Sequence, residues 1–306
     1  MAMRARRLLA AIGLCLVTAA PATARDPASE LAEVLDRFRD RYGFPGGTAA
    51  IALPGTRLVA AASGLADVEA GRAMTSGTPM LAASLGKSFV AAVVLALESE
   101  GRLLQAEHLS EHLGDRLWFD TLPNAAPITI GHLLRHQSGL PDHPHLSEFQ
   151  TALAMRVADN GAAFTPEEVL AFALGQDPLF RAGAGWAYSD TGYILLGLVI
   201  ERVIGRPYYD VLREILLDPL ALRETRPSDR QGIPGLAVGY TVPGNPSGLP
   251  ERTADAAGRL VWNPAVEWTG GGLASTASDL ARWGQVLFRG TALERVAFNR
   301  PHSRPP

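Results

Sequence analysis

Strand-like sequence stands on both sides of a long helical middle, and this order limits the folds open to the chain. The segments "GTAAIALPG" and "TRLVAAASG" meet at a Pro-Gly turn and predict a β-hairpin. Residues 108–223 then have a mostly helical pattern, interrupted by Gly and Pro. Residues 235–243 and 259–262 are again typical of short strands. We therefore expect an α+β protein with a helical insertion.

Three further segments predict helices. Apolar residues recur at helical spacing over residues 30–41, before the hairpin. A longer apolar helix is expected over residues 84–100, directly after the hairpin region. The segment "STASDLARWGQVLF" predicts a helix near the other end, with Ser275 or Thr276 as its N-terminal cap. The chain after residue 290 has neither helical nor strand periodicity, so we expect a domain over residues 25–290 and an irregular tail over 291–306.

The first 24 residues have the layout of a secretory signal peptide. Arg4, Arg6 and Arg7 precede an apolar run over residues 8–20, and Ala22-Thr23-Ala24 resembles a cleavage site. The apolar run is too short to span a membrane, although a buried helix is an alternative. Cys15, the only cysteine, lies inside this run and lacks the small residues expected before a lipidated cysteine. The sequence thus predicts a periplasmic or secreted protein without stable membrane insertion.

The charge balance bears on possible partners. Cleavage after Ala24 would remove three of the 28 basic residues and none of the 31 acidic ones, changing the net charge from −3 to −6. An acidic chain is a poor match for nucleic acid or an anionic membrane surface. We therefore expect neither as a partner.

Lys87 is the only lysine, so all other basic residues of the chain are arginines. It lies three positions after Ser84 near the start of an expected helix, and residues at this spacing share one helix face. A lysine that has lost its proton can accept one from a serine, whereas arginine stays protonated. The first turn of a helix also offers unpaired N–H groups to a developing oxyanion. A lone surface charge remains the alternative for Lys87.

A second candidate segment is "YSDTGYILLG", at the entrance of another apolar helix. Tyr188 can act as a proton shuttle, or it can simply be a packed aromatic residue. Asp190 can lie beside Lys87, or it can serve only as the helix cap. These alternatives remain open at the level of sequence.

The ordered blocks of this chain resemble the serine β-lactamase-related family. The family includes class C β-lactamases, D-alanyl-D-alanine carboxypeptidases, D-aminopeptidases and family VIII esterases. "SLGK" matches its Ser-x-x-Lys box, "LLRHQSGLPD" its Leu-Leu-x-His-x-Ser-Gly-Leu block, and "YSDTGYILLG" its Tyr-x-Asn box. "LLDPLALRET" and "GGGLASTASDLARW" match two later blocks.

The resemblance implies a β-lactamase/transpeptidase-like fold, with an antiparallel sheet flanked by helices and a helical lobe. It implies Ser84 as the acyl-accepting nucleophile, Lys87 as its base partner and Tyr188 as the proton shuttle, without metal or cofactor. The expected reaction is acyl transfer followed by hydrolysis. The expected substrate is a small ester, a β-lactam or a D-amino-acid peptide or amide such as those related to peptidoglycan.

Two departures from the family pattern bear on activity. Asp190 stands where the family usually has Asn, and a carboxylate beside Lys87 favours its ammonium form. Tyr188 would then be the better base. We also find no convincing Lys/His-x-Gly box after "GGGLASTASDLARW", and the segment "WTGGG" belongs to that earlier block. The expectation is a C-terminally truncated chain with an incomplete sheet and one oxyanion donor too few.

Two other functions compete with the serine hydrolase. Four histidines fall within fourteen residues and would suit a zinc hydrolase: His132, His136, His143 and His145. The serine-family block already accounts for part of this cluster, which makes the metal site the weaker reading. A penicillin-binding sensor that acylates once, or an inactive homologue, is the second alternative.

Overall fold

The computed structural model describes residues 26–55, 57–159, 162–242, 244 and 250–291. Within them the helices are α1 (Pro27–Tyr42), α2 (Gly86–Ser99), α3 (Leu109–Leu113), α4 (Ile130–Leu134), α5 (Ser147–Ala158), α6 (Pro166–Ala171), α7 (Asp190–Ile204), α8 (Tyr208–Leu212), α9 (Trp268–Gly271) and α10 (Ala277–Phe288). The strands are β1 (Gly46–Ala52), β2 (Leu58–Asp67), β3 (Arg72–Ala73), β4 (Met80–Leu81), β5 (Arg226–Pro227) and β6 (Leu273–Ser275). Short 3₁₀ turns cover Ala83–Leu85, Phe119–Thr121, His143–His145 and Pro264–Val266, and a π-helical turn covers Arg213–Leu217.

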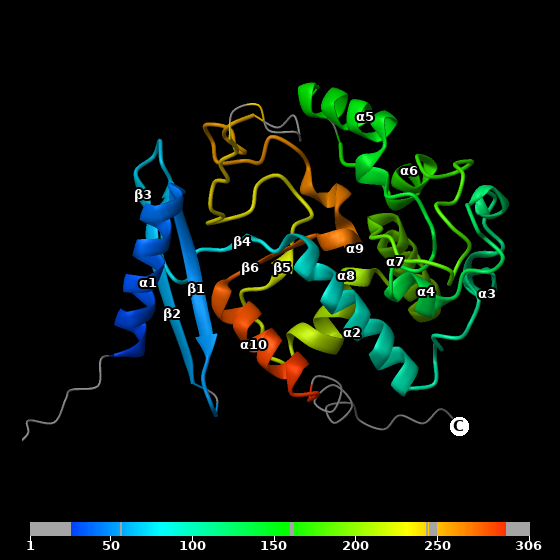
Figure 1. Cartoon of the computed structure of the whole chain (residues 1–306), viewed down its shortest axis with the longest axis horizontal. Helices are drawn as coiled ribbons and strands as arrows, with labels where there is room; N and C mark the ends of the chain where they lie inside the picture. The colour runs from blue at the N-terminus through cyan, green and yellow to red at the C-terminus, as the bar shows by residue number, and fades with distance from the viewer. Residues whose placement is uncertain (1–25, 56, 160–161, 243, 245–249, 292–306) are drawn as a thin grey trace, which may run out of the picture.

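The predicted hairpin is confirmed as the antiparallel pair β1–β2, in register from Gly46 opposite Gly64 to Ala52 opposite Leu58. Strand β3 extends this sheet in the order β1-β2-β3. Figure 1 shows α1 on the outer side of the sheet and α10 between the sheet and the rest of the molecule. The predicted helices are confirmed, and Thr276 is the cap of α10, since its side chain accepts a hydrogen bond from Asp279 N. The α+β class is therefore confirmed.

The second sheet differs from the sequence prediction. It has the order β4-β6-β5 and is antiparallel, but each strand is only two or three residues long. The strands predicted at 235–243 and 259–262 are wrong among the described residues, where only the single bridges Tyr240–Arg252 and Ala254–Leu260 form. Their backbone groups bond other segments instead. For example, Val238 N donates to Ala66 O and Leu260 N donates to Gln231 O.

Helices α2 and α7 form the centre of the apolar core. Every residue of α7 from Thr191 to Ile200 is buried, which explains why this helix is apolar on all sides. Figure 1 shows α3, α4 and α6 gathered around α7 as a helical lobe. Helix α9 packs against both α2 and α7. The N-terminal ends of α2 and α7 therefore meet α9 at one place, between the lobe and the second sheet.

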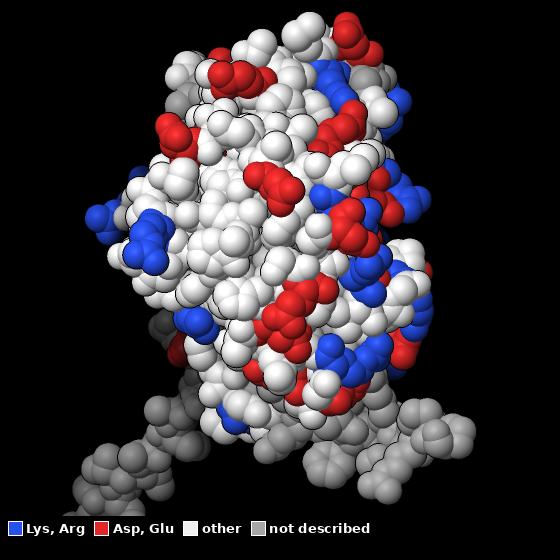
Figure 2. Space-filling model, turned by 90° about the vertical axis from the view of Figure 1, so that its right-hand side faces the viewer, with Lys and Arg blue, Asp and Glu red and all other residues white. Residues whose placement is uncertain are grey.

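The described surface adds little about partners. Figure 2 shows one face on which acidic and basic side chains are interspersed around a largely uncharged centre. Nothing on this face indicates a nucleic acid partner. Among the described residues, none of the helices has the length and apolar character that crossing a membrane requires. The predicted signal peptide at 1–24, with Cys15, and the predicted tail beyond residue 291 lie outside the described residues.

Candidate active site

The candidate nucleophile lies on a tight turn that leads into α2. Ser84 is the middle residue of the 3₁₀ turn Ala83–Leu85, and its side chain is exposed. Ala83 has a φ of 48°, in the left-handed region that L-residues with a Cβ rarely adopt. Backbone strain of this kind concentrates at functional sites. The turn thus presents Ser84 at the surface while Lys87, one turn later, is buried.

The amine of Lys87 has contacts on several sides. Nζ donates hydrogen bonds to Ser84 Oγ at 3.2 Å and to the carbonyl oxygen of Gly270, and forms an ion pair with Asp190 Oδ1. It also lies 5.0 Å from the centre of the Tyr188 ring and 5.6 Å from that of Tyr193. Anionic and carbonyl oxygens and aromatic faces all stabilise a cation. The amine of Lys87 therefore joins the nucleophile turn to α9 and to the start of α7.

Asp190 is not the cap of α7. The cap is Ser189, whose hydroxyl accepts a hydrogen bond from Gly192 N at 3.3 Å. Asp190 is the first residue of the helix, and its carboxylate turns to Lys87. Of the two alternatives left open by the sequence, the structure shows the ion pair.

Tyr188 reaches Ser84 from the segment that precedes α7. Its hydroxyl donates a hydrogen bond to Ser84 Oγ at 2.8 Å. Ser84 Oγ therefore accepts hydrogen bonds from both the phenol and the amine. Lys87 comes from α2, Tyr188 and Asp190 from the start of α7, so segments about 100 residues apart in sequence converge on one hydroxyl.

Asp142 accepts a hydrogen bond at the start of α7, and the sequence analysis did not predict this role. Its Oδ1 accepts a hydrogen bond from Asp190 N at 2.7 Å, and Oδ2 lies 3.5 Å from His145 Nε2. Burial, followed by the charge of Asp190, raises the pKa of the Asp142 carboxyl above its usual value. Asp142 ends the block "LLRHQSGLPD", which thereby anchors the residues that face Lys87.

Three consecutive glycines bring α9 against the nucleophile turn. A Cβ on Gly271 would lie 2.7 Å from the carbonyl carbon and oxygen of Ala83, and a Cβ on Gly86 would lie 3.0 Å from Gly271 Cα. Only glycine allows these two backbones to approach so closely. Because α9 lies so close to the nucleophile turn, the carbonyl oxygen of Gly270 can accept a hydrogen bond from the amine of Lys87. This explains why the glycine-rich block belongs to the site.

Glu267, just before α9, is a second acidic residue that sequence reasoning missed. Burial and then the charge of Asp190 raise the pKa of its carboxyl to about 7, while Lys87 acts in the opposite direction. An isolated acid beside "WTGGG" was the only signal in the sequence. Together with Asp142 and Asp190, it makes the surroundings of the single lysine acidic.

The four clustered histidines do not converge. Their ring nitrogens have separate partners: Thr129 for His132, Ser189 for His136, Thr191 for His143 and Asp142 for His145. No three His, Cys, Asp or Glu side chains within the described residues are grouped so that they could hold a metal ion. The zinc alternative thus has no support from the arrangement of these histidines.

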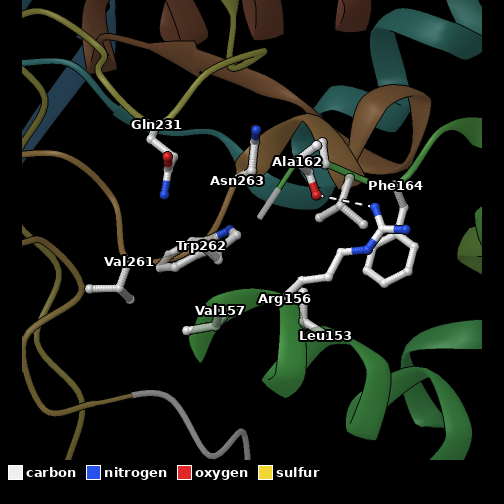
Figure 3. Close-up of a pocket in the computed structure, with 11 residues that line it drawn as sticks. Leu153, Arg156, Val157, Ala162, Phe164, Gln231, Val261, Trp262 and Asn263 are labelled. Carbon is white, nitrogen blue, oxygen red and sulfur yellow. Dashed lines mark hydrogen bonds between the residues drawn. The ribbon is translucent and has the colours of Figure 1, made fainter. Parts of the chain in front are cut away.

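A cleft between α5 and residues 261–266 is too small to hold a substrate. It offers about 10 Å³ to water, close to the minimum for one molecule. Figure 3 shows Arg156 lying across it, with its guanidinium 3.7 Å from the centre of the Phe164 ring and bonded to Ala162 O at 3.1 Å. The exposed hydroxyl of Ser84, rather than this cleft, marks the candidate site.

Known proteins are similar to this chain over most of its length. The chain is 28% identical over 275 residues to "Penicillin-binding protein 4*" of Bacillus subtilis (strain 168), which covers 87% of this chain and 57% of that protein. It is 33% identical over 205 residues to "Esterase EstB" of Burkholderia gladioli, covering 64% of this chain and 50% of that one. The chain thus spans about half the length of the curated relatives it matches.

A solved structure is similar over most of the chain. The D-amino acid amidase from Ochrobactrum anthropi SV3, complexed with L-phenylalanine amide, superposes with a TM-score of 0.70 at 27% identity. The match covers 88% of this chain and 72% of the amidase, and it supports the β-lactamase/transpeptidase-like fold. The model of the Beta-lactamase family matches residues 31–302. The chain therefore belongs to the Beta-lactamase family.

Proposed function

We propose that the chain is a serine hydrolase that works through an acyl-enzyme on Ser84. One observation carries the proposal: a single exposed hydroxyl is hydrogen-bonded to both a buried lysine amine and a tyrosine hydroxyl. Paired contacts of this kind activate a weak nucleophile. The "SLGK" and "YSDTG" boxes of the sequence supply the three residues.

The proposed reaction begins with attack of Ser84 Oγ on an acyl carbon. The hydroxyl proton passes to the Tyr188 oxygen, which lies 2.8 Å from Ser84 Oγ; for this step Tyr188 must be a phenolate, which accepts from Ser84 the hydrogen bond that the phenol donates in the structure. Lys87 Nζ lies 5.0 Å from the centre of the Tyr188 ring and donates a hydrogen bond to Ser84 Oγ. Tyr188 returns the proton to the leaving group, and water then hydrolyses the acyl-enzyme. The N–H of Ser84, in the first turn before α2, is our candidate oxyanion donor.

The proposed substrates are uncharged esters with apolar groups. The neighbours of the reacting residues in sequence are apolar and exposed: Leu85 is 56% exposed and Trp186 is 65% exposed. The acidic residues around Lys87 oppose a substrate carboxylate, which β-lactams and D,D-peptides carry. The similarity to a protein named as an esterase agrees with this choice.

Labelling tests the proposal directly. The full chain is treated with a fluorophosphonate and digested, and mass spectrometry locates the adduct. We expect it on Ser84 and none in Ser84→Ala. An adduct on Ser88, whose hydroxyl accepts a hydrogen bond from Trp283, or on the buried Ser138 would contradict the assignment.

Substrate class is tested with p-nitrophenyl acetate, nitrocefin and a D-amino acid amide. Turnover of the ester above the other two supports the proposed class. A label that forms but no turnover of any substrate would indicate a sensor, and no label at all would indicate an inactive homologue. Either result would refute the proposed hydrolase.

Export is a separate proposal that depends only on residues 1–24. Expression in a Gram-negative host should give a mature chain that begins at Arg25 in the periplasm or the medium. A cytoplasmic chain that retains residues 1–24 would refute it.

A further inference from the structure

We propose that His136 is the positioning residue that holds Tyr188 against Ser84, and that it does so as a neutral imidazole with its proton on Nε2. The inference rests on the proposed function, in which Tyr188 exchanges a proton with Ser84. The contacts of the His136 side chain are with Ser189 and the neighbouring rings, and not with Ser84. It acts through the segment that carries Tyr188.

Three contacts connect His136 to three consecutive residues. Its carbonyl oxygen accepts a hydrogen bond from Ala187 N at 3.0 Å, and its Nδ1 accepts one from Ser189 N at 3.1 Å. Between them, its ring stacks on the Tyr188 ring at 4.5 Å between centres and 28° between planes. Because Nδ1 accepts a backbone N–H, it carries no proton, and a neutral ring must then carry its proton on Nε2.

The segment needs such support, since residues 172–189 contain no described helix or strand. Tyr188 is also 37% exposed, so packing alone does not immobilise its ring. Two other rings also pack against the His136 ring. The ring centre of Trp186 lies 6.1 Å from that of His136 in an edge-on arrangement, and the ring centre of Tyr193 lies 5.2 Å away. His136 therefore stands at the centre of the aromatic group that determines where the Tyr188 hydroxyl lies.

The backbone of His136 is itself unusual. Its φ is 56°, just after the end of α4, and its N–H donates to Leu133 O at 3.2 Å. This left-handed conformation is tolerated by Asn and strained for large residues. It turns the imidazole away from the helix direction. A sequence pattern of helical spacing does not reveal this orientation.

The charges around His136 connect its protonation to Tyr188. Burial, and then the charge of Lys87, lower the pKa of His136, while Asp190 acts in the opposite direction. The other titratable groups that face its ring are the phenols of Tyr188 and Tyr193. Protonation of Nδ1 would remove the acceptor for Ser189 N. Acid below the ordinary histidine range of about 6.5 should thus release Tyr188 from Ser84.

The test measures the rate of fluorophosphonate labelling of Ser84 from about pH 5 to pH 8. His136→Asn keeps an acceptor and suits the left-handed backbone but removes the ring, and His136→Phe keeps a ring but removes the acceptor. Near pH 7.5 we expect both variants to be labelled roughly 10- to 100-fold more slowly than the parent. This is part of the rate enhancement that a positioned proton-transfer group such as Tyr188 contributes. The parent should lose rate in acid, and both variants should lack this histidine-dependent loss.

Two controls separate positioning from general structure. His112, which pairs with Glu107 on the far side of the lobe, is replaced by Gln and should leave rate and pH profile unchanged. In a Tyr188→Phe background, His136→Asn should cause no further loss, because the two residues act as one unit. Equal losses with and without Tyr188, or a parent-like pH profile in His136→Asn, would overturn the inference.

A measurement that needs no activity completes the test. In ¹⁵N NMR of the parent chain, His136 should show an unprotonated Nδ1 and a protonated Nε2, with ring contacts to Tyr188 that vanish on acidification. A parent that is never labelled refutes the hydrolase, and the NMR result then decides the inference alone. A proton on Nδ1 at neutral pH would overturn it.

Discussion

Replacing Lys87 by Met tests whether the ion pair with Asp190 is a stability element as well as a catalytic one. Met keeps the apolar stem and removes the amine. Lys87 is 5% exposed and the Asp190 side chain 23% exposed, so the remaining carboxylate would be largely buried without its cation. Removing one partner of a buried pair costs about 3–5 kcal/mol, and because Asp190 keeps some exposure we expect a loss of about 3 kcal/mol.

The double variant Lys87→Met/Asp190→Asn removes both charges and keeps the shapes. Replacing a buried pair by neutral groups of similar volume is often close to neutral, so this variant should unfold within about 1 kcal/mol of the parent. Its activity should stay lost. We expect both the single and the double variant to label Ser84 roughly 10³-fold more slowly than the parent, because proton transfer is no longer supported.

The assay combines urea unfolding, followed by tryptophan fluorescence, with fluorophosphonate labelling of the parent, Lys87→Met, Asp190→Asn and the double variant. The comparison separates the contribution of Lys87 to stability from its contribution to the activation of Ser84, which a single substitution changes together. If the double variant is as unstable as Lys87→Met, the ion pair is not the source of the loss. If either variant labels at the rate of the parent, Lys87 has no part in activating Ser84.

Three other predictions follow from single contacts. Lys87→Arg should abolish labelling as fully as Lys87→Ala, because the observed contacts converge on one nitrogen and a guanidinium spreads its donors; parent-like labelling would contradict this. Gly271→Ala should unfold about 1–3 kcal/mol more easily and label Ser84 roughly 100-fold more slowly, since its methyl meets the nucleophile turn. Gly284→Ala in α10, where a Cβ meets nothing within 4 Å, is its control in both assays. Burial lowers the pKa of His143 to about 3. Below about pH 6.5 the imidazole is therefore protonated in the unfolded chain but not in the folded one, and the free energy of unfolding falls with pH. Between about pH 8 and pH 5 the parent should lose about 2 kcal/mol more than His143→Gln in urea titrations, and equal losses would refute the argument.

Residue types and their order made the central part of the site predictable. Ser84 and Lys87 share a helix face by spacing, and Tyr188 stands at a helix entrance that the apolar pattern reveals. The resemblance of these segments to the family's blocks predicted that Ser84, Lys87 and Tyr188 act together. The two alternatives for Asp190 could not be separated in this way, because a carboxylate at a helix start suits a cap and an ion pair equally well.

The remaining parts of the site depend on backbone geometry, which residue patterns do not encode. Gly270 contributes a carbonyl oxygen, and any residue type has one. The second sheet was missed because strands of two or three residues are shorter than one period of a reliable pattern. The apolar runs near residues 240 and 260 have the residue pattern of strands. Their backbones pair with other segments only at single positions, so no strand forms there.

Asp190 changes the surroundings of Lys87. With Asn at this position, as in the resembling family, Lys87 would have a neutral neighbour in place of a carboxylate. Here a carboxylate, a carbonyl oxygen and two aromatic faces surround the amine. Proton transfer in the proposed reaction then falls to Tyr188, which is partly exposed and lies in an irregular segment. The residue that we propose to orient this phenol, His136, therefore bears directly on the proposed proton transfer.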